Sequence, residues 1–81
     1  LNIQAIAQRG YTYHLMKHYQ EAIQDFDRAI AINPNYTWGR MQRGYNNLLM
    51  QRYEEAIQDF DCVLENDLQQ NGAIALRGIG Y

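Results

Sequence analysis

The sequence predicts an all-α fold in which antiparallel helix pairs stack side by side. Two observations support this prediction: the chain repeats itself every 34 residues, and each repeat holds two stretches with apolar residues at helical spacing. Aligning residues 3–36 with residues 37–70 gives 14 identical positions, where chance would give about two. The identical pairs are Gln8/Gln42, Arg9/Arg43, Gly10/Gly44, Tyr11/Tyr45, Leu15/Leu49, Met16/Met50, Tyr19/Tyr53 and the block Glu21–Asp27 against Glu55–Asp61.

The second half of each repeat predicts an amphipathic helix. Its apolar residues recur every three or four positions, which places them on one helical face, while polar residues occupy the other face. The stripe is Tyr19, Ala22, Ile23, Phe26 and Ile30 in repeat one, and Tyr53, Ala56, Ile57, Phe60 and Leu64 in repeat two. The first half of repeat one carries a weaker stripe of Ile3, Ile6, Gly10 and Tyr13.

Turn residues divide these stretches into separate helices. Pro34 cannot donate to a preceding turn and pushes Asn33 out of helical geometry, so a helix ends there. Lys17-His18 is a short connection of the kind that an antiparallel helix pair needs. Repeat two has Leu68 where repeat one has Pro34, so its closing turn is less strongly encoded. We expect five helices, near residues 3–16, 20–32, 37–50, 54–66 and 71–81.

A third copy begins at Asn71. Ala73, Ile74, Ala75, Arg77, Gly78 and Tyr81 match Ala5, Ile6, Ala7, Arg9, Gly10 and Tyr13. The chain is therefore expected to be a single module over residues 1–81, and a piece of a longer repeat protein. Its parts are repeat one at 3–36, repeat two at 37–70 and a partial third repeat at 71–81.

The period and its residues resemble the tetratricopeptide repeat family. The residues that carry the resemblance are Gly10, Tyr13, Ala22, Phe26 and Pro34, then Gly44, Ala56 and Phe60, then Gly78 and Tyr81. Departures from the family pattern are Arg9, Arg43 and Arg77 in place of a leucine, Asn47 in place of a tyrosine, and Leu68 in place of the proline. The resemblance implies an α-solenoid of about two and a third repeats that binds other polypeptides.

The recurring Arg-Gly and Gln-Asp-Phe-Asp sequences predict a structural polar link. An arginine beside a core-facing glycine would be costly to leave unpaired. The expected partners lie within or between repeats, and they are either Asp25 and Asp59 or Asp27 and Asp61. An anion site built from Arg9, Arg43 and Arg77 is the alternative.

The first helix of each repeat is the expected binding surface, because the resemblance implies that first helices line the concave, peptide-binding side. A rotation of 100° per residue defines the face opposite the core stripe. That face comprises Gln4, Gln8, Tyr11, Leu15, Trp38, Gln42, Tyr45 and Leu49, with Met41 at its margin and Gly72, Leu76 and Ile79 in the third copy. It has no acidic or basic residue and is rich in aromatic side chains, which favours an apolar or aromatic peptide. Alternatively, Tyr11 and Tyr45 pack between adjacent first helices.

Two ligand classes known in the family are disfavoured by the same positions. The resemblance places a clamp for C-terminal carboxylates on Ala7, Tyr11, Gln42, Gly72 and Leu76, and none of these matches the Lys, Asn and Arg of that clamp. An asparagine ladder would occupy Gln8, Gln42 and Leu76, where glutamine is close but leucine is not.

A structural role is the alternative function. A helix over 71–81 would expose Ile74, Leu76 and Ile79 with no helix after it, and repeat arrays need polar end caps. The chain would then self-associate end to end, exchange helices, or dock onto the rest of a longer chain. A regulatory segment attached to an enzyme is a third possibility.

No enzymatic activity, cofactor or metal is expected. His14 and His18 have a spacing that suits a metal, but no third ligand is evident. Cys62 has acidic sequence neighbours that oppose a reactive thiolate, and Asp25 and Asp27 do not share a helical face.

Charge and composition exclude further partners. The net charge of −2, with both signs scattered, argues against nucleic acid, and no apolar run is long enough to span a membrane. A single cysteine excludes an internal disulfide and fits a reducing compartment, so we expect a cytoplasmic protein.

Overall fold

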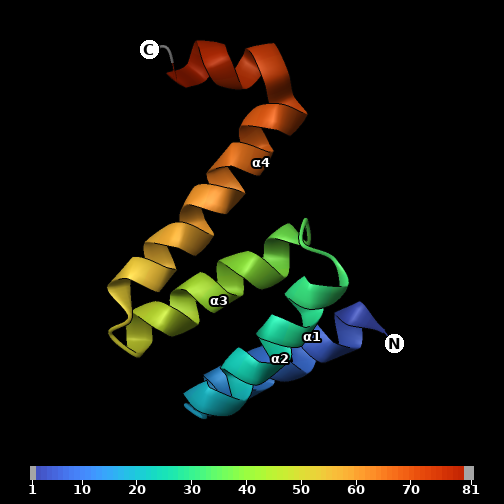
Figure 1. Cartoon of the computed structure of the whole chain (residues 1–81), viewed down its shortest axis with the longest axis vertical. Helices are drawn as coiled ribbons and strands as arrows, with labels where there is room; N and C mark the ends of the chain where they lie inside the picture. The colour runs from blue at the N-terminus through green and yellow to red at the C-terminus, as the bar shows by residue number, and fades with distance from the viewer. Residues whose placement is uncertain (1, 80–81) are drawn as a thin grey trace.

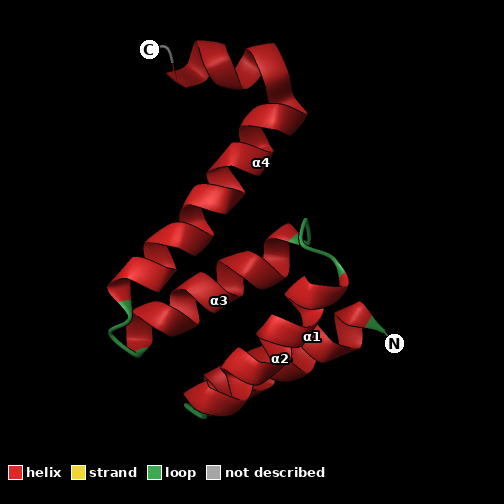
Figure 2. Cartoon of the chain, in the orientation of Figure 1, coloured by secondary structure: helices red, strands yellow, loops and turns green. Residues whose placement is uncertain are grey.

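The chain folds into helix hairpins joined by short turns, as Figures 1 and 2 show for this computed structural model. The structure describes the backbone of residues 2–79 and the side chains of residues 2–66. Within that range the helices are α1 (Ile3–Leu15), α2 (Tyr19–Ile32), α3 (Thr37–Leu49) and α4 (Tyr53–Ile79), and there is no strand. α1 packs on α2, α3 packs on α4, and α2 packs on α3. The predicted all-α architecture of helix pairs is confirmed.

The prediction of five helices is wrong, because α4 runs unbroken from Tyr53 to Ile79 and joins the predicted helices 54–66 and 71–81 into one. α2 ends at Ile32, where Asn33 takes an extended conformation ahead of Pro34. Repeat two has Leu68 at that position, and leucine keeps its backbone donor and continues a helix readily. Figure 1 shows α4 bending in its red C-terminal part without a break in the ribbon.

The same backbone motif closes both hairpin turns. Lys17 takes a left-handed conformation with φ of 66°, and Gln51 does so with φ of 62°. In repeat one, the His18 amide donates to the Tyr13 carbonyl at 2.8 Å and the Lys17 amide donates to the His14 carbonyl at 3.0 Å. Repeat two forms the equivalent pair of hydrogen bonds, also at 2.8 and 3.0 Å. This is the Schellman arrangement, with a non-glycine residue where glycine is usual.

The two helices of each hairpin approach closely because a glycine faces a phenylalanine. Phe26 is fully buried, and a Cβ added at Gly10 would lie 2.9 Å from its ring. A Cβ added at Gly44 would lie 2.7 Å from the ring of Phe60. Alanines fill the remaining space of this thin core, and Ala7, Ala22, Ala29 and Ala56 are fully buried.

We predict that Gly10→Ala destabilises the fold, although alanine favours the helix, because the added methyl overlaps a Phe26 ring that is enclosed on all sides. Overpacking of this kind should lower the free energy of unfolding by about 1–2 kcal/mol in urea titration. Gly39→Ala is the matched control: its methyl meets only the half-buried ring of Tyr36, in the turn before α3, which can swing aside. Equal losses in both variants would contradict the interpretation.

Lys17→Gly should stabilise the chain. The left-handed conformation costs a non-glycine residue about 1–2 kcal/mol, and the extra flexibility of an unfolded glycine offsets part of that gain. The net increase in the free energy of unfolding should be about 0.5–1 kcal/mol. Lys17→Ala retains the unfavourable conformation and should not raise stability, so a gain in both variants would assign the effect to the lost charge.

Candidate functional site

A buried carboxylate in each second helix is held by an arginine from the first helix of the same repeat. The Arg9 Nε and Nη2 atoms each donate to a carboxylate oxygen of Asp25 at 2.8 Å. Arg43 binds Asp59 in the same two-pronged way, at 2.9 Å through Nε and 2.7 Å through Nη2. Both aspartates are buried, so these pairs are the structural polar link that the sequence predicts.

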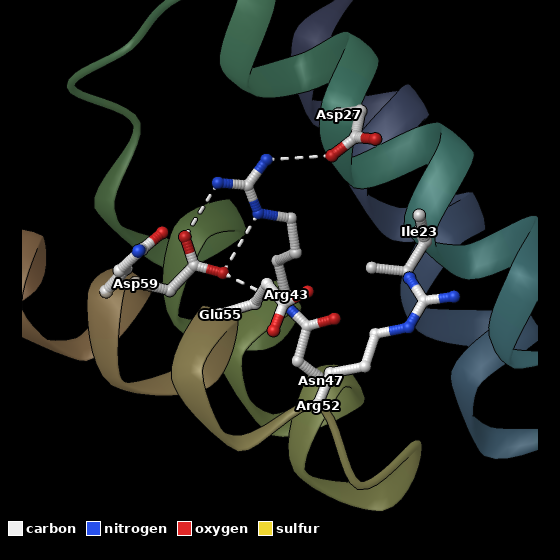
Figure 3. Close-up of a pocket in the computed structure, with 8 residues that line it drawn as sticks. Ile23, Asp27, Arg43, Asn47, Arg52, Glu55 and Asp59 are labelled. Atoms are coloured by element: carbon white, nitrogen blue, oxygen red, sulfur yellow. Dashed lines mark hydrogen bonds and ion pairs between the residues drawn. The ribbon is translucent and has the colours of Figure 1, made fainter.

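Arg43 also joins the two repeats. Its Nη1 atom donates to Asp27 of α2 at 2.7 Å, so the guanidinium lies between carboxylates of α2 and α4, as Figure 3 shows. Asp59 is further surrounded by Arg40, at 3.7 Å, and by the Asn47 amide, which donates to it at 3.4 Å. The predicted link therefore acts both within repeat two and between the repeats.

The arginines remain charged at physiological pH. Hydrogen bonding to Asp59 raises the pKa of Arg43, against the opposing effect of burial, and hydrogen bonding to Asp25 raises the pKa of Arg9. A raised arginine pKa stabilises the folded state at every pH below the ordinary arginine value, and this stabilisation is lost only as pH rises through the folded-state value. The guanidinium groups of Arg9 and Arg43 therefore keep their positive charge across the physiological pH range.

The ion pairs of Arg43 lie along the wall of a pocket of about 250 Å³ (Figure 3). It is lined by Ile23, Asp27, Arg43, Asn47, Arg52, Glu55, Gln58 and Asp59. Both Asp59 oxygens accept hydrogen bonds from Arg43, so this carboxylate is not available as a general base. The anion site proposed as an alternative is disfavoured too, because Arg9 and Arg43 are already neutralised. The side chain of Arg77, its third member, lies outside the described residues.

Arg43→Met should destabilise the fold strongly, because it leaves the buried Asp59 with only a distant arginine and a long amide contact. We expect a loss of about 2–4 kcal/mol in the free energy of unfolding by urea titration. Arg28→Met serves as control, since Arg28 is exposed and reaches Asp25 only at 3.5 Å. A similar small effect in both variants would show that the network is dispensable.

Nine of the ten predicted groove residues lie on α1 and α3, with different degrees of exposure, whereas Leu76 lies on the continuous α4 rather than on a separate first helix. Gln4, Gln8, Leu15, Tyr45 and Leu49 are exposed, Tyr11, Trp38, Met41 and Gln42 are half-buried, and the side chain of Leu76 lies outside the described residues. The pockets found in the described region do not coincide with this face: besides the pocket at Arg43, one of about 230 Å³ lies near Pro34 and one of about 500 Å³ near Ala5 and Ile6.

Aromatic side chains join the two first helices on this face. The ring centroids of Tyr11 and Trp38 lie 5.7 Å apart in an edge-to-face arrangement. Tyr11 thus packs against the next first helix, as the alternative reading of the sequence anticipated. Tyr45 instead contacts Phe60 of α4, with centroids 5.3 Å apart, and its side chain is exposed at the end of the array.

A second polar bridge between the repeats was not predicted from the sequence. Asn46 is fully buried, and its amide nitrogen donates to the Tyr19 carbonyl at 3.1 Å. Its amide oxygen therefore accepts from His14 Nδ1, 2.9 Å away. Repeat one has Thr12 at the equivalent position, so the periodicity gives no sign of this bridge.

The two histidines have separate structural partners. His14 is bound to Asn46, whereas the His18 ring stacks on Tyr13 with centroids 6.1 Å apart. Among the described residues, no three histidine, cysteine, aspartate or glutamate side chains are grouped to hold a metal ion, and Cys62 is an exposed free thiol. No helix in the described part of the chain is long and apolar enough to cross a bilayer.

Comparison with known proteins gives a match to one family. No curated protein and no solved structure matched the chain significantly. The family model described as Tetratricopeptide repeat matches residues 3–36, which are the first repeat and comprise α1, α2 and the turn that follows them. Residues 3–36 are therefore a tetratricopeptide repeat, and they support assigning the chain to the tetratricopeptide repeat family.

Proposed function

We propose that this protein binds a peptide or protein segment along the uncharged face of α1 and α3. Tetratricopeptide repeats generally are protein–protein interaction modules and typically have no enzymatic activity of their own. We extend the repeat assignment to residues 37–70 as repeat two and 71–81 as a partial third repeat, on their internal sequence identity.

The aromatic pair of Tyr11 and Trp38 is the observation that carries this proposal. It lies at the seam between the first helices, with its rings partly open to solvent. Leu15 and Leu49 are exposed on the same two helices and add apolar surface to this face. Partly exposed aromatic and aliphatic side chains that cluster on one surface are typical of a recognition site.

The charge distribution supports an apolar or aromatic partner. The arginines of α1 and α3 lie on the side that faces the second helices, where aspartates neutralise them, so the opposite face carries no charge. Such a face suits apolar or aromatic side chains and suits a carboxylate tail poorly. Gln8 and Gln42 supply amides that can bind a peptide backbone. Ala7, one of the positions of the carboxylate clamp, is fully buried.

Trp38 is the only tryptophan, so its fluorescence reports on this face directly. Peptides selected from a random library should shift the Trp38 emission to shorter wavelength as they remove its ring from water. With labelled peptide and anisotropy as the readout, Trp38→Ala and Tyr45→Ala should each weaken binding by about tenfold or more.

Ile57→Ala is the matched control, because Ile57 is an exposed apolar residue on α4, outside the proposed face. It should leave peptide affinity unchanged. Binding that survives both Trp38→Ala and Tyr45→Ala but is lost in Ile57→Ala would move the site to α4 and reject the proposed face.

A further inference from the structure

One face of α4 is exposed, although the equivalent face of α2 is largely buried. We call Tyr53, Ile57, Phe60 and Leu64 the α4 face; their counterparts in α2 are Tyr19, Ile23, Phe26 and Ile30. Ile30 is 8% exposed while Leu64 is 59% exposed, and Tyr53 and Ile57 are 56% and 57% exposed where their counterparts are half-buried. The difference has a simple origin, because α3 packs on α2 and no equivalent helix packs on α4 within the described residues.

The sequence that should cover the α4 face is present in the chain. Residues 71–79 repeat the pattern of the first helices, with Arg77-Gly78 in the register of Arg43-Gly44. In the structure these residues continue α4 beyond a bend and lead away from the α3–α4 hairpin (Figure 1), so they do not fold back onto the face that precedes them. The chain therefore contains both the uncovered α4 face and a segment suited to cover it, residues 71–79, but the two do not pack together within one copy.

The charges of the face and of the covering helix are complementary. At the junction between repeats one and two, Asp27 of α2 accepts a hydrogen bond from Arg43 at 2.7 Å. The same register pairs Asp61, which is exposed on α4, with Arg77 of a covering helix. Ile74 is equivalent in the repeat to Arg40. An apolar residue at this position suits a face on which Leu64 is exposed.

We propose that two copies of the chain exchange residues 71–79, each copy covering the α4 face of the other. The continuous α4 carries residues 71–79 away from their own hairpin, which makes them available to a second copy. The exchange is reciprocal, so it closes as a symmetric dimer rather than growing into a filament. Each junction then reproduces the packing of α3 on α2, with Asp61 of one copy bound to Arg77 of its partner.

A pair of charge reversals tests the exchange in the 81-residue chain. Sedimentation velocity should show a concentration-dependent dimer, and Asp61→Arg or Arg77→Asp alone should weaken it about tenfold, since each creates two like-charge junctions. An equimolar mixture of the two variants should restore the dimer, because the two reversed charges then face each other at one junction and the other junction is native. Pairing within one chain predicts no rescue on mixing, and that result, or a wild type that stays monomeric at millimolar concentration, would overturn the proposal.

A proline at the missing turn gives an independent test. Leu68→Pro restores the residue found at Pro34 and should break α4, so that residues 71–79 cover their own chain and the dimer becomes a monomer. Leu68→Ala keeps the helix and should keep the dimer. Persistence of the dimer in Leu68→Pro would contradict exchange through a continuous α4.

Two more variants distinguish the exchange of residues 71–79 from other ways of covering the α4 face. Ala5→Glu adds a charge to the exposed outer side of α1 and should leave the dimer intact, whereas head-to-tail stacking of α1 on α4 would be lost. Trp38→Ala should also leave the dimer intact, so failure of the exchange and failure of the proposed peptide site give different results. Loss of the dimer in Ala5→Glu would replace the exchange by head-to-tail stacking.

Discussion

Burial of Asp25 and Asp59 is the constraint on which the rest of the structure depends. A carboxylate in a helical core is tolerated only if its charge and its acceptors are satisfied. The two-pronged bonds from Arg9 and Arg43 meet that requirement and fix the first helix of each repeat against the second. Since Arg43 reaches Asp27 as well, one side chain sets the packing within a repeat and the stacking between repeats.

The same ion pairs shape the surface that we propose for binding. Because Arg9, Arg40 and Arg43 all turn towards aspartates on the second helices, the opposite face of α1 and α3 is left without charge. Tyr11 and Trp38 then meet across the seam between those helices. An interaction that organises the core therefore also determines which side chains lie on the face proposed for binding.

The end of the array shows how one residue changes the path of the chain. Asn33 and Pro34 end α2 and direct the chain into α3, which covers the α2 face. Leu68 at the equivalent place lets α4 continue, and the α4 face stays open to solvent. Loss of a single helix terminator thus converts an internal packing surface into an external one.

The sequence by itself determined the period, the helix pairs, the burial of Phe26 and the pairing of arginine with aspartate, because each recurs in register and obeys helical spacing. It did not determine the length of α4, since the absence of proline permits either a turn or a continuous helix. Only the tertiary structure decided that Tyr11 packs against Trp38 while Tyr45 turns to Phe60, because the outcome depends on what stacks beyond each helix. The bridge from His14 through Asn46 also required tertiary structure, as it joins residues 32 positions apart that share no repeat pattern.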